Sequence, residues 1–174
     1  MTRLFVDLDG VLADFDRGVT EITGKSPEQL SLRAMWRALA QAPDFFGTLA
    51  FMADAEVLWS FCAPHRPTIL TGLPLGSWAP AQKARWVKRM LGEDVPLITC
   101  MSRDKPRYGG PGHVLVDDRA TARAGWERTG GIFIHHLNAE RTIAALEAIG
   151  LADLRMANGS TGRATADHLR DVAC

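Results

Sequence analysis

The chain has 174 residues, of which 47% are hydrophobic, and its 20 basic residues balance 20 acidic ones. This length suits one domain with a substantial core, and the even charge lacks the basic excess that nucleic-acid binders usually present. Because no apolar run reaches the roughly 18 residues of a membrane span and the first strand-like segment leaves no room for a signal peptide, we expect a cytoplasmic protein that binds neither a membrane nor a nucleic-acid polymer.

Two carboxylates follow the first predicted strand. The apolar residues 4–6 lead directly into Asp7 and Asp9, and Gly10 then permits a turn. Residues two apart in a strand point the same way, so these carboxylates crowd together unless the chain turns or a cation lies between them. The carboxyl edge of a buried strand is the usual ligand position in an open α/β sheet, and carboxylate oxygens suit Mg²⁺.

A helical insertion is predicted over residues 15–50. Apolar residues recur there at helical spacing, and Ser26, followed by a proline, is a typical helix start. Such an insertion can act as a cap that closes over a site and excludes water. Its aromatic residues either face a substrate or pack the interior of the cap, and they are Phe15, Trp36, Phe45 and Phe46.

Strand and helix signals alternate after residue 50, which is typical of βαβ units and a parallel sheet. The predicted strands cover residues 67–71, 95–99, 113–117 and 131–135, and the predicted helices cover 53–63, 78–91, 119–128 and 139–149. Residues 151–174 lack apolar periodicity, and we expect a loosely held tail with a short helix at 166–172 and no role in catalysis.

Three later strand ends also carry polar groups. Thr71 and Gly72 end the second strand, Lys105 lies in the polar loop after the third, and Asp117 and Asp118 end the fourth. Taken alone, these are an ordinary turn, a solvated charge and a helix N-cap. Together with the first acidic pair they give the order acid pair, threonine, lysine, acid pair.

This order resembles the four motifs of the haloacid dehalogenase-like (HAD) phosphatase superfamily, over residues 3–119. Segments 7–15, 44–49 and 116–119 look most like the 5'(3')-deoxyribonucleotidase branch. The resemblance implies an α/β, Rossmann-like core with a five-stranded parallel sheet in the order 3-2-1-4-5. In this division residues 1–14 and 51–150 form the catalytic core, 15–50 the small helical cap, and 151–174 the tail.

The resemblance also implies a phosphomonoester hydrolase. Asp7 is expected to be the nucleophile that forms an aspartyl-phosphate, because covalent catalysis splits one difficult displacement into two easier ones. Asp9 is expected to protonate the leaving alkoxide and then to deprotonate the attacking water.

Three further groups are expected to hold the phosphoryl oxygens: the Thr71 hydroxyl, the Gly72 N–H and the Lys105 ammonium. The segment from Lys105 to the second acid pair is long and rich in glycine and proline, so Arg103 and Arg107 are alternatives to Lys105. The expected cofactor is Mg²⁺, and its implied ligands are Asp7, the Asp9 carbonyl, Asp117 and Asp118.

The expected partner is a small phosphorylated metabolite, most similar to a nucleoside monophosphate, and the chain is expected to be a monomer or homodimer. By resemblance, Phe15, Trp36 and Phe46 fall near the base pocket. A sugar phosphate is the alternative substrate. Two alternatives lie outside this class. A dehalogenase is disfavoured because it needs no second carboxylate such as Asp9, and a receiver domain is disfavoured because it has no acid pair after its lysine.

Other conspicuous residues have structural interpretations. The three cysteines show neither disulfide nor zinc spacing, and Cys62 and Cys100 are expected to be small apolar residues near the core. The pair His135 and His136 is interpreted as loop histidines, because adjacent residues of an extended segment face opposite ways. One helix is expected to present a solvated basic face consisting of Lys83, Arg85, Lys88 and Arg89.

Overall fold

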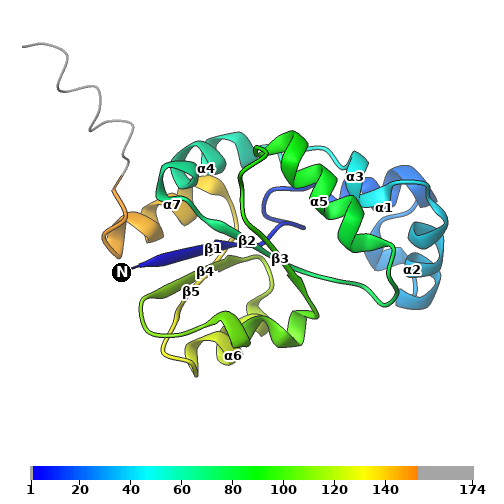
Figure 1. The fold of residues 1–174 in the computed structure, drawn as a ribbon. Helices are drawn as coiled ribbons and strands as arrows, with labels where there is room; N and C mark the ends of the chain where they lie inside the picture. Colours follow the sequence, from blue (N-terminus) through cyan, green and yellow to red (C-terminus); the bar gives the residue numbers. More distant parts are fainter. Residues whose placement is uncertain (1, 153–174) are drawn as a thin grey trace, which may run out of the picture.

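The computed structural model describes residues 2–152, and a five-stranded parallel sheet lies at its centre (Figure 1). The strands are β1 (Arg3–Val6), β2 (Thr68–Gly72), β3 (Leu97–Cys100), β4 (His113–Asp117) and β5 (Ile132–His135). Their order is β3-β2-β1-β4-β5, so the predicted order 3-2-1-4-5 is confirmed. Because all strands are parallel, their carboxyl ends meet at one edge of the sheet.

Both faces of the sheet are buried, as is usual for parallel sheets. Leu4 and Val6 belong to one apolar cluster, whereas Phe5 between them belongs to a second cluster on the opposite face. The neighbouring strand β4 repeats this alternation, since Val114 packs with the first cluster and Leu115 with the second. The apolar runs that predicted the strands are therefore explained by burial on two sides.

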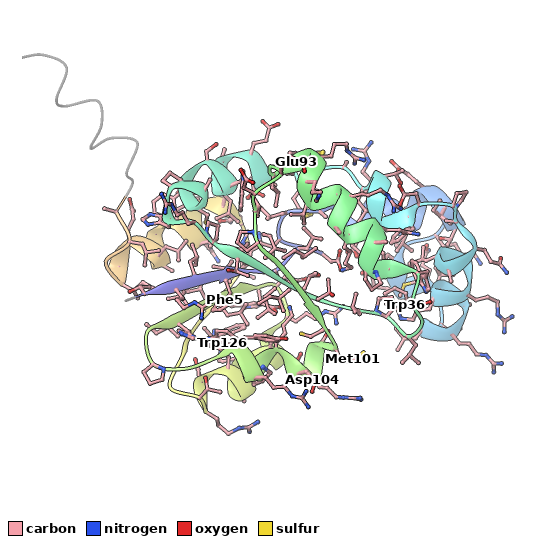
Figure 2. The ribbon with its side chains drawn as sticks, viewed as in Figure 1. Phe5, Trp36, Glu93, Met101, Asp104 and Trp126 are labelled. Carbon is pink, nitrogen blue, oxygen red and sulfur yellow. The ribbon has the colours of Figure 1, made fainter. Side chains whose placement is uncertain are left out.

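Helices cover both faces (Figure 1). Helices α4 (Ala55–Cys62), α5 (Ala79–Met90) and α7 (Ala139–Ala148) lie on one face, and the short α6 (Arg123–Glu127) lies on the other. On the α6 side, Trp126 packs edge-on against Phe5 with ring centroids 5.5 Å apart, and both residues are labelled in Figure 2.

The insertion after β1 is helical, as predicted. It contains α1 (Phe15–Thr23), the 3₁₀ turn η1 (Pro27–Gln29), α2 (Leu32–Gln41) and α3 (Phe45–Thr48), which gather at one end of the molecule (Figure 1). Side-chain caps define the helix starts: Asp14 accepts the Arg17 N–H at 3.1 Å, and Ser31 accepts the Ala34 N–H at 3.3 Å. The predicted start at Ser26 is confirmed as a capping box around η1.

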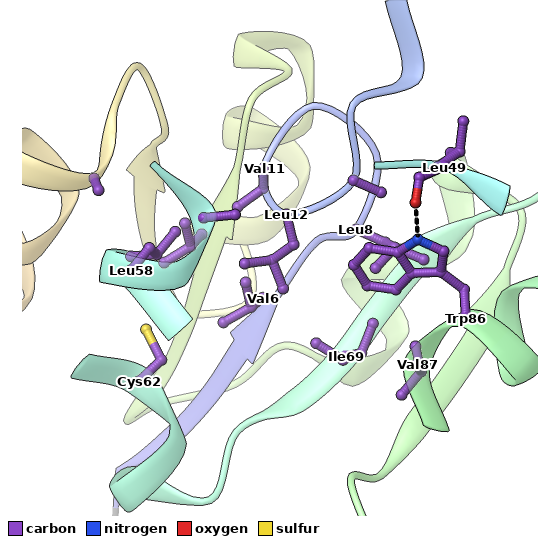
Figure 3. Packing of buried hydrophobic residues seen from close by; sticks show 14 of the residues in the cluster. Val6, Leu8, Val11, Leu12, Leu49, Leu58, Cys62, Ile69, Trp86 and Val87 are labelled. Atoms are coloured by element: carbon purple, nitrogen blue, oxygen red, sulfur yellow. Dashed lines mark hydrogen bonds between the residues drawn. The ribbon is translucent and has the colours of Figure 1, made fainter. Parts of the chain in front are cut away.

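Helix α5 anchors the chain where it returns from the insertion. The indole N–H of Trp86 donates to the Leu49 carbonyl at 2.7 Å, and Figure 3 shows this bond beside Ile69 and Val87. The indole is fully buried, so its only polar atom needs such a partner.

Some sequence predictions need correction. The helix expected over 119–128 is instead a 3₁₀ turn, η4 (Ala120–Ala122), followed by the short α6, and two more 3₁₀ segments are η2 (Ala63–His65) and η3 (Ser102–Tyr108). His135 is the last residue of β5 rather than a loop residue. His136 is buried, with Nδ1 2.9 Å from the Thr142 hydroxyl, because α7 packs back onto the strand end.

Cys62 is buried as expected, while Cys100 is only half-buried. None of the helices in residues 2–152 combines the length and the apolar character that a membrane span requires. The helix predicted at 166–172 lies outside the described residues.

Candidate active site

The predicted polar strand ends converge on one pocket of about 200 Å³ at the carboxyl edge of the sheet. Asp7, Asp9, Lys105 and Asp117 line it, whereas Thr71 and Asp118 are not lining residues but adjoin Gly72 and Asp117 in the chain. Its walls come from the loop after β2, the η3 turn, the loop after β4 and the helical insertion. This is the position at which open α/β sheets place their ligands.

A tight loop after β1 places the first acid pair. The Asp7 N–H donates to the Val116 carbonyl at 2.9 Å, which continues the ladder between β1 and β4. Gly10 then takes a φ of 77°, and a Cβ on this residue would overlap the carboxylate of Asp118. Glycine is therefore needed for both its backbone angle and its lack of a side chain.

Lys105 joins the two acid pairs. Its Nζ lies 2.9 Å from Asp7 Oδ2 and 2.6 Å from Asp117 Oδ2, and the side chain is almost fully buried. Burial alone would lower the pKa of Lys105, but the charges of Asp7 and Asp117 outweigh it and raise the pKa above its usual value. Lys105 is thus the buried lysine between the two acid pairs. Of its two alternatives, Arg103 also lines the pocket, whereas Arg107 is exposed and pairs with Asp104 at 3.3 Å.

Asp7, Asp117 and Asp118 bring one carboxylate oxygen each within 4.8 Å of one another. Asp117 is satisfied, because Oδ1 accepts the Arg119 N–H at 2.8 Å and Oδ2 faces Lys105. In contrast, Asp7 Oδ1 and Asp118 Oδ1 are buried without a hydrogen-bond partner. Buried polar atoms normally have partners, so these two oxygens fit the donor set of a hard cation such as Mg²⁺.

The pKa values reflect this crowding. Burial, reinforced by the charges of Asp7 and Asp117, raises the pKa of Asp118 to about 7. Burial and the Asp7 charge also raise the pKa of Asp117. The His135 ring supports the loop that carries these residues, with Nε2 2.9 Å from the Asp118 carbonyl oxygen.

A second buried lysine, Lys83, was missed by the sequence analysis. The prediction that it belongs to a solvated basic face is wrong, because its side chain is 0% exposed. Its Nζ forms an ion pair with Asp9 Oδ2 and donates to Thr71 Oγ1 at 2.9 Å. The missed signal was helical spacing: Lys83 shares one face of α5 with the buried residues Ala79, Trp86 and Val87.

Thr71 and Gly72 end β2 beside the pocket. Thr71 is fully buried, and because its oxygen accepts from Lys83, its O–H remains able to donate. Gly72 lines the pocket, and a Cβ there would overlap the hydroxyl of Ser102. Ser102 itself lines the pocket and is a second functional candidate that the sequence analysis did not single out.

Two of the three aromatic residues predicted to contact substrate lie in the pocket wall, namely Trp36 (labelled in Figure 2) and Phe46. The third, Phe15, is not among the lining residues. It packs on Trp36 and Phe45, with ring centroids 5.7 and 5.5 Å apart. Phe15 is thus placed as a support for the aromatic wall.

The sequence matches no protein-family model and no curated protein. Solved structures do share its fold. A HAD-superfamily hydrolase of subfamily IA from Geobacter sulfurreducens aligns with a TM-score of 0.54 at 13% identity, covering 84% of this chain and 99% of that one. A HAD-superfamily hydrolase from Ehrlichia chaffeensis aligns with a TM-score of 0.53 at 10% identity, covering 86% and 98%.

The L-2-haloacid dehalogenase from Xanthobacter autotrophicus, solved with chloropropionic acid covalently bound, is also similar. It aligns with a TM-score of 0.51 at 14% identity, covering 92% of this chain and 88% of that one. At these identities the likeness establishes the fold of HAD-superfamily hydrolases and leaves the reaction to be argued from the residues of the site.

Proposed function

We propose that this chain is a Mg²⁺-dependent phosphomonoester hydrolase that forms an aspartyl-phosphate on Asp7. The observation that carries the proposal is the set of three buried carboxylate oxygens without partners, on Asp7, Asp9 and Asp118. Asp7 and Asp9 line one small pocket, and Asp118 lies beside Asp7. Four carboxylates lie close to two buried lysines here, and Arg103 and Arg119 also line the pocket. A divalent cation would supply the partner that the unpartnered carboxylate oxygens lack.

Asp7 is oriented for nucleophilic attack. Lys105 holds one of its oxygens at 2.9 Å, and the other has no protein partner. Lys105 and Ser102 line the pocket and can donate to a phosphoryl group there. The O–H of Thr71, which is buried and precedes the lining residue Gly72, is a further donor beside the pocket. Such preorganised donors stabilise the charge that develops during phosphoryl transfer.

Asp9 suits the role of acid and base. Burial raises its pKa, although Lys83 opposes that shift, so the carboxyl retains a proton more readily than a solvated aspartate does. It gives this proton to the leaving alkoxide while the P–O bond breaks. The resulting carboxylate then takes a proton from the water that attacks the aspartyl-phosphate.

Asp7 and Asp118, through their unpartnered oxygens, and the Asp9 carbonyl would hold the cation, with Asp117 beside them. When bound, Mg²⁺ neutralises the repulsion between the phosphate and the carboxylates. The substrate we favour is a nucleoside monophosphate, because the half-buried Trp36 lines the pocket and offers an aromatic ring on which a base can stack. Phe46 is buried between Trp78 and Lys83 and supports this wall. A sugar phosphate, which needs the same catalytic groups but no aromatic wall, is the alternative.

Two other functions fit less well. The dehalogenase neighbour raises the possibility of attack by Asp7 on carbon, but that reaction has no use for the acid Asp9. A receiver domain is disfavoured by topology, since such domains have the strand order 2-1-3-4-5 whereas this sheet has 3-2-1-4-5.

Release of phosphate from a panel of esters tests the proposal. The panel contains nucleoside 5'- and 3'-monophosphates, sugar phosphates and p-nitrophenyl phosphate, each with Mg²⁺ and with EDTA, and 2-haloacids are assayed for halide release. We expect phosphate release that requires Mg²⁺ and is absent from an Asp7→Asn preparation purified in parallel. Halide release without phosphatase activity, or phosphatase activity equal in Asp7→Asn, would contradict the proposal.

A further inference from the structure

Lys83 lies on α5, outside the four strand-end motifs, yet it is as closely integrated into the site as Lys105. Its ammonium contacts Asp9 Oδ2 and Thr71 Oγ1, and it lies over the Phe46 ring, 4.3 Å from the centroid. Two of the three N–H donors of the ammonium thus have an oxygen partner, and the aromatic ring adds a cation–π contact. The position of its charge is therefore fixed.

This contact makes the two oxygens of Asp9 different. Oδ2 is engaged by Lys83, whereas Oδ1 is buried and has no hydrogen-bond partner. Asp9 also lines the pocket. An unanchored carboxylate can rotate and exchange its oxygens, so the ion pair with Lys83 selects Oδ1 as the oxygen that is free to react.

The helix that carries Lys83 is itself held in place. The Phe46 N–H donates to Gln82 Oε1 at 2.9 Å, and the Trp86 indole binds the Leu49 carbonyl at 2.7 Å. Both bonds join α5 to the chain around α3. These bonds hold α5 against the segment that carries Phe46. Lys83 on this helix therefore contacts both the Phe46 ring in the pocket wall and the carboxylate of Asp9.

We propose that Lys83 is a positioning residue that anchors Asp9 through Oδ2 and so directs Oδ1 toward the oxygen of the leaving group. The inference rests on the proposed phosphatase function and adds a residue to it. As the P–O bond breaks, its electron pair stays with the leaving oxygen, which takes the proton from Asp9 Oδ1. Lys83 keeps its protons throughout.

The test compares Lys83→Met with Lys88→Met, which changes an exposed lysine on the same helix. Each variant is assayed with Mg²⁺ on a nucleoside monophosphate, whose alkoxide leaving group needs a proton, and on p-nitrophenyl phosphate, whose leaving group needs little help. For Lys83→Met we expect kcat on the nucleotide to fall by about a hundredfold, the scale of general acid catalysis. The loss on p-nitrophenyl phosphate should be under about tenfold, with KM nearly unchanged for both.

Added ammonium or methylamine should restore part of the lost kcat on the nucleotide, because a small amine can occupy the space of the missing ammonium. Lys88→Met should behave as wild type. An equal loss on both substrates with no recovery by amines, or no loss at all, would overturn the proposal in favour of a packing role for Lys83.

A second comparison covers the case in which removing one partner of a buried ion pair prevents folding. The double variant Asp9→Asn/Lys83→Met removes both charges and should match Asp9→Asn on each substrate within about threefold, because residues that act as a unit are not additive. A further loss beyond about tenfold would mean that Lys83 does not act through Asp9. If wild type hydrolyses none of the esters, the proposed function itself fails. If wild type is active but Lys83→Met keeps the wild-type ratio of kcat on the nucleotide to kcat on p-nitrophenyl phosphate, only the positioning role is refuted.

Discussion

Gly10 and Asp118 lie in contact, although 108 positions separate them in the chain, and the missing side chain of Gly10 makes room for the Asp118 carboxylate. The loop after β1 carries the proposed nucleophile, and the loop after β4 carries the second acid pair. Their close approach sets the spacing of the oxygens that are proposed to share a cation.

The first prediction concerns this contact. Gly10→Ala combines a left-handed backbone with a clash, so it should lower the free energy of unfolding by about 2 to 4 kcal/mol and weaken activation by Mg²⁺. Gly24→Ala is the matched control, because Gly24 has a similar φ of 70° but open space around it. Thermal unfolding of both variants separates the cost of the left-handed backbone, which both share, from the cost of the clash with Asp118. Equal destabilisation of the two variants would show that the contact with Asp118 does not matter.

The second prediction concerns pH and the metal. The pKa of Asp118 is raised from 3.8 to about 7 by burial and by Asp7 and Asp117, so its contribution to stability is greatest at low pH and is lost as the pH rises toward 7. At pH 8 in EDTA, Asp118→Asn should therefore unfold at a temperature a few °C above wild type, and the difference should vanish near pH 4.

Added Mg²⁺ should raise the unfolding temperature of wild type at pH 8 more than that of Asp118→Asn, because a cation relieves the same repulsion. Asp94→Asn, at an exposed acid far from the pocket, controls for the loss of one charge. A lower unfolding temperature for Asp118→Asn in EDTA, or an identical response to Mg²⁺, would contradict the cation site.

The third prediction concerns the substrate. Stacking of a base on an aromatic side chain contributes roughly 1 to 3 kcal/mol, so Trp36→Ala should lower kcat/KM for a nucleoside monophosphate by about ten- to a hundredfold. Hydrolysis of glycerol phosphate, which lacks a base, should change little. Phe15→Ala removes a ring that supports Trp36 without lining the pocket. It should therefore lower kcat/KM for the nucleotide, relative to glycerol phosphate, less than Trp36→Ala does. Equal losses on both substrates would favour a substrate without a base.

Much of the fold and part of the site could be predicted from the sequence, because the signals are local. Each apolar run ends directly at its polar residue, so Thr71 and Asp117 mark strand ends that parallel topology must bring to one edge. The resemblance supplied the strand order, which no local signal contains.

The residues that were missed depend on packing between distant elements. Lys83 looked like a member of a basic surface because Arg85, Lys88 and Arg89 follow it in sequence. It is buried because α5 packs where Thr71, Asp9 and Phe46 meet. Ser102 gains its place because Gly72 leaves room for it. The orientation of Phe15 likewise follows from how α1 packs against Phe45, which periodicity alone does not specify.

The most direct test of the account is detection of the aspartyl-phosphate. The Asp9→Asn variant should accumulate it from p-nitrophenyl phosphate, because this leaving group departs without an acid while the base that activates water is absent. With ³²P-labelled substrate and acid quench, we predict protein-bound label that hydroxylamine removes, that maps to the peptide containing Asp7, and that is absent from Asp7→Asn/Asp9→Asn. The covalent mechanism would be contradicted if wild type turns over while Asp9→Asn shows neither a burst of p-nitrophenol nor protein-bound label. Label on a residue other than Asp7 would contradict it as well.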